Sequence, residues 1–139
     1  MIVIDFRPVF LVIGLLLVIL SGGMVIPSVI DLIAGNPDWA AFAIAAGFTA
    51  FVGAAMVMTA RTGAVTLTLR QAFLLTTLSW IVLPIFASLP FMISDLHLSF
   101  TDAFFEAMSG ITTTGATVIT ELDNAPPGVL LWRGILQWL

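Results

Sequence analysis

Long runs of hydrophobic residues alternate with short polar connections along this chain. Three runs have the ~20 mostly apolar residues that a helix needs to cross a bilayer. They extend from Val9 to Ile33, from Trp39 to about Ala60 and from Gln71 to Ile93. Pro27 predicts an interruption late in the first run. Pro84 predicts a kink in the third, because proline removes a backbone donor and crowds the preceding turn. The pattern therefore predicts an all-α integral membrane fold.

A shorter apolar run, Phe100 to Met108, follows the third span. At a rise of ~1.5 Å per residue it could reach only about half-way across the hydrocarbon core. Ser99 and Asp102 have the spacing of a capping box at its start, and Gly110 is a natural stop at its end. This pattern is typical of a re-entrant half-helix, which enters the membrane without crossing it.

The last element begins after Pro126-Pro127-Gly128 and continues to Leu139. It supplies about 12 of the ~20 residues that a helix needs to cross a bilayer. We therefore expect this sequence to be an N-terminal fragment of a longer membrane protein.

Composition supports a membrane-embedded chain. Of the 139 residues, 60% are hydrophobic and only 9% are charged, whereas soluble domains carry about 25% charged residues. The polar surface is too small to cover a water-soluble globule. The sequence has no cysteine and a single histidine, His97, which excludes disulfides, thiolate metal sites and clusters of histidine ligands. We expect no cofactor and no nucleic-acid partner.

The charges predict how the chain is oriented. Arg7 precedes the first span, and Arg61 and Arg70 lie between the second and third, so the positive-inside rule places these segments in the cytoplasm. The segment from Ser94 to about Asn124 then faces outside. Acidic residues gather on or near that side: Asp31, Asp38, Asp95, Asp102, Glu106, Glu121 and Asp123. Acids often populate external loops without a special role, but as a group they raise the cation concentration at an external mouth.

The segment from Ser109 to Thr117 carries the candidate chemistry. It holds four threonines and two glycines without a charge, directly after the predicted half-helix. Polar irregular backbone at membrane depth is tolerated only where protein buries it or where it lines a water-filled cavity. A potassium-selective filter needs a ring of backbone carbonyls, a loop that turns at glycine, and a half-helix whose negative C-terminal end faces the ion. The order span, half-helix, loop, span meets these needs; a simple polar turn is the alternative.

Residues 99–117 resemble the first pore loop of TrkH-type potassium uptake proteins, which belong to the Trk/Ktr superfamily of cation transporters, and more distantly the KtrB proteins. Thr113-Thr-Gly-Ala-Thr117 shares its first threonine and central glycine with the TVGYG filter of potassium channels. It departs from that signature at Thr114, Ala116 and Thr117. The resemblance extends along the whole chain, and Trp132 to Trp138 is similar to the start of the family's second pore helix.

The resemblance implies four span–loop–span repeats around one pore, of which this sequence contains the first. Residues 1–65 would form an accessory pair of transmembrane helices, and residues 66–139 the first pore repeat with its last helix incomplete. One quarter of a selectivity filter would come from the carbonyls of Thr112, Thr113, Thr114 and Gly115, with K⁺ bound at Thr113 and Thr114 and with support from Gly110, Ala116, Thr117 and Glu106.

The resemblance also implies potassium uptake across the cytoplasmic (inner) membrane by a homodimer. A cytoplasmic TrkA-like nucleotide-binding subunit would gate it, and the filter loop would lie on the external side. The sequence leaves open whether transport is passive or is a symport coupled to protons or sodium. The alternative function is a non-transporting membrane sensor or anchor module. An enzyme is disfavoured because the spans contain no aspartate pair, no Ser/His set and no HExxH motif.

Two charged side chains lie where ionisable groups are costly. We expect Glu106, in the half-helix, to hydrogen-bond the filter backbone or a neighbouring repeat. Arg133 would pair with an acid of another repeat or form an electrostatic barrier near the filter. Small residues four apart in the second span, Ala43 with Gly47 and the Ala46–Ala54 series with Gly53 beside it, predict close packing between helices.

Overall fold

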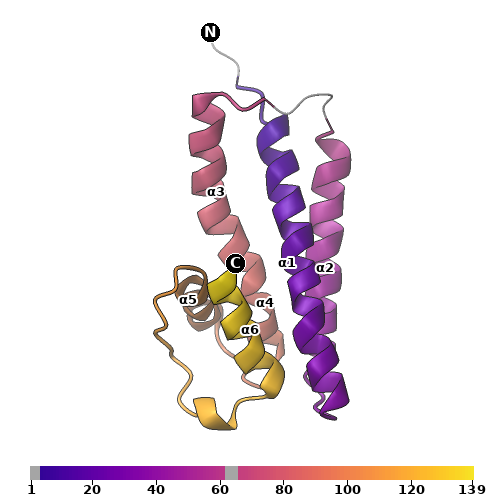
Figure 1. Cartoon of the computed structure of the whole chain (residues 1–139), viewed down its shortest axis with the longest axis vertical. Coiled ribbons are helices and arrows are strands. Elements are labelled where there is room, and N and C mark those ends of the chain that lie inside the picture. Colours follow the sequence, from indigo (N-terminus) through magenta and orange to yellow (C-terminus); the bar gives the residue numbers. More distant parts are fainter. Residues whose placement is uncertain (1–3, 62–65) are drawn as a thin grey trace.

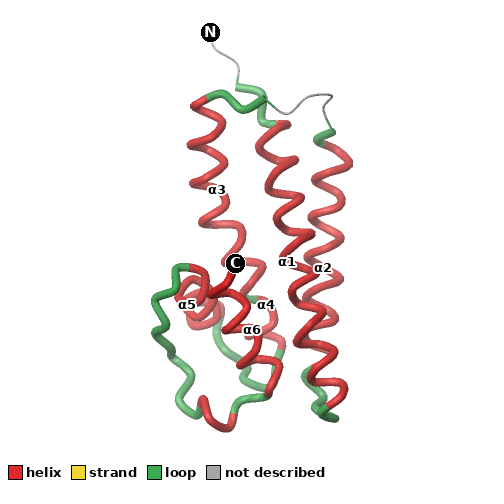
Figure 2. Tube along the Cα trace, in the orientation of Figure 1, coloured by secondary structure: helices red, strands yellow, loops and turns green. Residues whose placement is uncertain are grey.

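The computed structural model describes residues 4–61 and 66–139 of the chain. These residues form helices and connecting loops, without a strand in the described ranges (Figures 1 and 2). The elements in chain order are α1 (Arg7–Ile33), α2 (Trp39–Thr59), α3 (Leu69–Ala87), α4 (Leu89–Ile93), α5 (Phe100–Ile111), the short 3₁₀ helix η1 (Leu122–Asn124) and α6 (Pro127–Trp138). The predicted all-α membrane fold is confirmed, since three segments are long and apolar enough to cross a bilayer. The predicted boundary between units at residues 65 and 66 stays a prediction, because residues 62–65 lie outside the described ranges.

The helices α1 and α2 form an antiparallel pair. Gly14 and Gly53 face each other at their contact, where a Cβ on either glycine would lie 2.8 Å from the carbonyl oxygen of the other. Such small residues let helix backbones approach closely in lipid. Gly53 therefore packs as predicted, whereas Gly47 lines an open groove of about 380 Å³ between the two helices. Pro27 does not interrupt α1, which continues to Ile33.

The third span consists of two helices. Thr68 starts α3 with a full capping box: its hydroxyl accepts from the Gln71 amide (3.3 Å), and the Gln71 side chain accepts from the Thr68 amide (2.9 Å). The helix passes through Pro84, and the break comes at Ser88, just before α4. Pro90 explains this position, because it has no amide to donate to the carbonyl four residues earlier.

The short helices α5 and α6 pack together, with α6 against α1 and α5 against α3. The C-terminus ends near the middle of the molecule's length (Figure 1). Trp132 of α6 lies at the centre of this packing and is fully buried. Its indole nitrogen donates to the carbonyl of Ala87 (3.0 Å), and its ring meets Phe42 edge-on with centroids 6.3 Å apart. One side chain therefore ties the start of the last helix to both α2 and α3.

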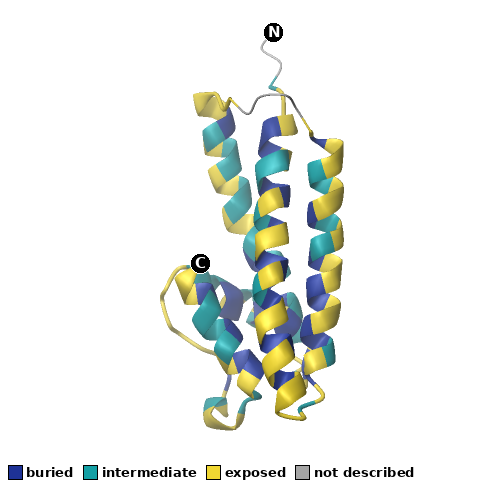
Figure 3. Ribbon diagram, turned by 45° about the vertical axis from the view of Figure 1, so that its right-hand side comes forward, coloured by how far each residue is buried: buried dark blue, intermediate teal, exposed yellow. Residues whose placement is uncertain are grey.

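Many large hydrophobic side chains are exposed on the outer faces of the long helices (Figure 3). Phe51 of α2 and Phe73 of α3 are 73% and 68% exposed. An exposed apolar face on this scale is typical of a surface that contacts lipid or another apolar partner.

Candidate functional site

The half-helix α5 does not stop at Gly110, as the sequence predicted, but continues to Ile111 and ends in a Schellman motif. The amide of Thr113 donates to the Gly110 carbonyl (3.0 Å), and the amide of Thr114 donates to the Ser109 carbonyl (2.9 Å). These are the two hydrogen bonds that define the motif. Thr113 takes the left-handed position, with φ of 58°, where glycine is usual because it has no Cβ.

Gly110 has a different role from the predicted stop. A Cβ at this position would lie 2.9 Å from the Cβ of Leu136 in α6. The absence of a side chain therefore lets α5 and α6 pack at this short distance. At the start of α5, Ser99 accepts from the Asp102 amide (3.2 Å), which is one half of the predicted capping box.

The backbone after α5 leaves four consecutive carbonyl oxygens free. The amides of residues 112–115 all donate back into α5, the last of them from Gly115 to the Ser109 carbonyl (3.4 Å). The carbonyls of the same four residues accept no hydrogen bond from any described residue. The run ends at Ala116, whose carbonyl accepts from the Ser109 hydroxyl (2.7 Å). Free carbonyls in an exposed membrane loop need water or a cation as partner.

The conformation of this loop depends on Gly115. Its φ is +79°, and a Cβ built there would meet no atom within 4 Å. Backbone conformation rather than space therefore requires glycine at this position. The hydroxyls of Thr112 and Thr114 lie 2.8 Å apart, and Thr112 also donates to the carbonyl of Met108 (2.8 Å).

Glu106 connects the loop to α5 and α6. Its Oε1 accepts from the Thr117 hydroxyl (2.6 Å) and the Val118 amide (2.5 Å), and its Oε2 pairs with Nε of Arg133 at 3.0 Å. Glu106 is buried and the Arg133 side chain is 15% exposed. The backbone amide that Glu106 binds belongs to Val118, one residue after the predicted loop, so the predicted contact with the filter backbone itself stays a prediction. Arg133 pairs with Glu106 of the same chain segment, and its predicted pairing with another repeat and its predicted role as an electrostatic barrier both stay predictions.

The structure brings the predicted site residues together around one loop. Residues 112–115 form its turn. The Ala116 carbonyl accepts from the Ser109 hydroxyl, and the Thr117 hydroxyl donates to Glu106. Gly110 lets α5 pack closely against α6. Sequence reasoning missed the role of Ser109. Ser109 lies in the last turn of α5, seven residues before Ala116. No sequence pattern predicts their hydrogen bond, because it depends on how the loop folds back onto the helix.

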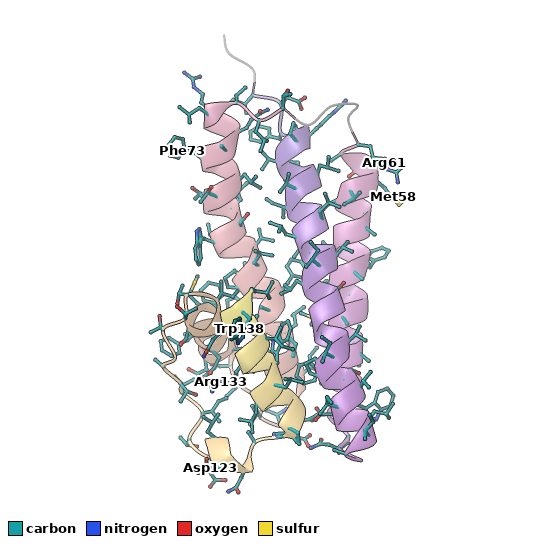
Figure 4. The ribbon with its side chains drawn as sticks, in the orientation of Figure 1. Met58, Arg61, Phe73, Asp123, Arg133 and Trp138 are labelled. Atoms are coloured by element: carbon teal, nitrogen blue, oxygen red, sulfur yellow. The ribbon has the colours of Figure 1, made fainter. Side chains whose placement is uncertain are left out.

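The arginines outside the site lie at one end of the molecule. Arg7 begins α1 and Arg70 lies at the start of α3, and these two helix ends are at the same end of the molecule (Figure 1). Arg61 lies at that end as well, whereas Asp123 lies at the other (Figure 4). Arg133 is the exception, beside the loop. This separation of charge matches the sequence pattern from which an orientation was predicted.

Comparisons with known proteins agree with this architecture. Residues 39–139 match the family model TrkH, described as cation transport protein. The Trk system potassium uptake protein TrkH of Halomonas elongata is 45% identical over 134 residues, which cover 96% of this chain and 28% of that protein. TrkH of Escherichia coli K12 is 38% identical with the same coverage. The chain thus spans little more than a quarter of the length of these relatives.

A solved structure shows the same fold. The crystal structure of the potassium transporter TrkH from Vibrio parahaemolyticus matches with a TM-score of 0.90 and 39% sequence identity, covering 97% of this chain and 29% of that one. The family model covers more than half of the chain, from the start of α2 to its last residue. This chain belongs to the TrkH family of cation transport proteins.

Proposed function

We propose that this chain takes part in potassium uptake across the cytoplasmic membrane, as the first pore repeat of a longer transporter. The loop at residues 112–115 would supply one quarter of a carbonyl-lined selectivity filter. The relatives named above are potassium uptake proteins, which supports the choice of ion. The observation that carries the proposal is the run of four free carbonyls at residues 112–115. The amides of the same four residues all donate to carbonyls of α5.

The chemistry of this arrangement suits a weakly held cation. A potassium ion that sheds water needs several neutral oxygens arranged around it, because a full charge would bind too tightly for conduction. The loop offers carbonyls, and the threonine hydroxyls of Thr113 and Thr114 add further oxygens at the predicted K⁺ positions. The C-terminal end of α5 carries partial negative charge and lies directly below the loop. The Glu106 carboxylate is buried, and its oxygens already accept from the Thr117 hydroxyl and pair with Arg133.

The proposal extends to the arrangement of the whole protein. Three further loops of this kind would complete the ring, and residues 1–65 would form the accessory helix pair. We place the N-terminus in the cytoplasm and the loop outside, supported by the arginines at one end of the molecule. A homodimer with a TrkA-like cytoplasmic subunit follows from the family resemblance alone. The relatives are transport proteins, which supports a role without catalysis.

A substitution at Gly115 tests the proposed filter. We expect Gly115→Ser in the complete protein to lower rubidium or potassium uptake by about fivefold to thirtyfold in potassium-starved cells. A side chain at φ of +79° costs ~1–2 kcal/mol and turns the carbonyls away from the ion. Gly47→Ser is the matched control, because it lies on the open groove of the accessory pair. Unchanged uptake and unchanged preference for potassium over sodium in Gly115→Ser would contradict the filter and favour the sensor or anchor alternative.

A further inference from the structure

Two carboxylates join the accessory helix pair to the pore repeat. Asp31, in the last turn of α1, accepts from the amide of Gly128 in the first turn of α6 (2.7 Å). Asp38, just before α2, accepts from the amide of Asp95, which follows α4 (3.0 Å). Only glycine permits the first contact, because a Cβ at position 128 would collide with the Asp31 carboxylate. Both contacts link segments that are far apart in sequence.

Each carboxylate has one oxygen without a hydrogen-bond donor. Asp31 is fully buried and Asp38 is 4% exposed. The Oδ1 atoms accept the two amide hydrogen bonds, whereas both Oδ2 atoms are buried without a partner among the described residues. An unsatisfied buried acceptor is costly, and more so when it is charged. The two carboxyl groups also interact electrostatically, so two negative charges would repel each other here.

We propose that Asp31 and Asp38 form a buried proton-binding site at the joint between the accessory helix pair and the pore repeat. A proton on one of the two carboxyl groups neutralises a buried charged oxygen that has no hydrogen-bond donor. It also removes the repulsion between two negative charges. Both amide contacts survive, because they use the Oδ1 atoms. The site does not depend on the identity of the transported ion.

The surroundings of the pair favour this assignment. Burial is the main cause that raises the pKa of Asp38; the hydrogen bond from the Asp95 amide lowers it, the Asp95 carboxylate raises it and His97 lowers it. Asp95 and His97 both lie in the connection between α4 and α5. The first turns of α2 and α6 carry no titratable side chain, and Arg133, further along α6, is paired with Glu106. No group of three metal-binding side chains occurs within the described ranges, whereas a bound proton needs only one carboxyl group.

The sign of the pH dependence follows from the raised pKa of Asp38. The folded protein holds this proton at pH values where the unfolded chain has lost it. The stability that the proton confers is therefore complete below the ordinary value of 3.8 and is lost as the pH rises through the raised pKa.

Thermal unfolding of the complete purified protein in detergent, from about pH 4 to pH 8, tests the site. We expect Asp38→Asn to unfold at the same temperature as the wild type at low pH and several degrees higher at high pH. The side-chain amide is permanently neutral, as the protonated carboxyl group is, and its oxygen still accepts from the Asp95 amide. Asp123→Asn, an exposed acid at the same end of the molecule, should follow the wild-type curve throughout.

Several results would overturn the proposal. Parallel curves for Asp38→Asn and the wild type would show that no proton is held at the pair. Potassium bound at the filter would stabilise the wild type and Asp38→Asn alike. A response to potassium or sodium at high pH that occurs in the wild type and is absent from Asp38→Asn, with N-methylglucamine as the replacement at constant ionic strength, would assign the site to a monovalent cation. Asp31→Asn provides a second variant with the same expected behaviour, and failure of both amide variants to fold would also contradict the proposal.

Discussion

At the scale of single residues, Glu106 is a buried carboxylate whose two oxygens both have hydrogen-bond or ion-pair partners. A carboxylate within a half-helix at membrane depth needs partners for both oxygens, and here it has a hydroxyl, an amide and Arg133. The sequence indicated that Glu106 was unusual, because ionisable groups are rare in such segments. It could not identify Arg133 as the partner, since 27 residues of loop and helix separate the two.

Removing the Glu106 carboxylate tests whether its contacts with Thr117, Val118 and Arg133 stabilise the fold. We expect Glu106→Ala to lower the free energy of unfolding by ~3 kcal/mol, because it leaves the largely buried Arg133 side chain, which is 15% exposed, without its partner. The Val118 amide also loses its acceptor. Chemical denaturation of the complete protein in detergent measures the change.

Asp102→Ala provides the control for this experiment. The residue lies in the first turn of the same helix, where a negative charge contributes only ~0.3–1 kcal/mol. The double variant Glu106→Gln with Arg133→Gln should lose less free energy of unfolding than the sum of the losses in the two single variants, as expected for residues in contact. Equal effects of Glu106→Ala and Asp102→Ala would contradict the assigned role.

At the scale of elements, the position of the carbonyl loop depends on how α5 and α6 pack. Gly110 permits the close approach to Leu136, and Trp132 anchors α6 to α2 and α3. The lengths and order of the helices could be predicted from hydrophobic runs, because the bilayer fixes how long a span must be. The end of α5 could not, since a threonine takes the left-handed position and Gly110, the expected stop, is used for packing.

A methyl group at Gly110 tests the dependence on packing. We expect Gly110→Ala to destabilise the complete protein by ~1–3 kcal/mol, because the new Cβ lies 2.9 Å from the Leu136 Cβ and the helices must separate. Potassium uptake should fall with it as the loop moves. Gly134→Ala, where a Cβ meets no atom within 4 Å, should be neutral or stabilising, since alanine favours helix by ~1 kcal/mol over glycine. Similar unfolding curves for the two variants would count against the close α5–α6 contact.

At the scale of the whole molecule, polar contacts join distant helices at both ends. The long helices α1 and α2 are attached to the rest of the chain at one end through Asp31 and Asp38, and at the other through the Gln71 side chain, which donates to the Asp5 carbonyl (2.6 Å). The loop with the free carbonyls, residues 112–115, lies on an exposed surface. Such a loop makes chemical sense only when other loops complete a ring around the ion.

The most direct test of this ring is a structure of the complete protein with rubidium or thallium in place of potassium. The account predicts ion density within coordination distance of the carbonyl oxygens of residues 112–115, with Glu106 still bonded to Arg133. Ion density confined to other loops, with these four carbonyls bonded to protein, would contradict the central claim.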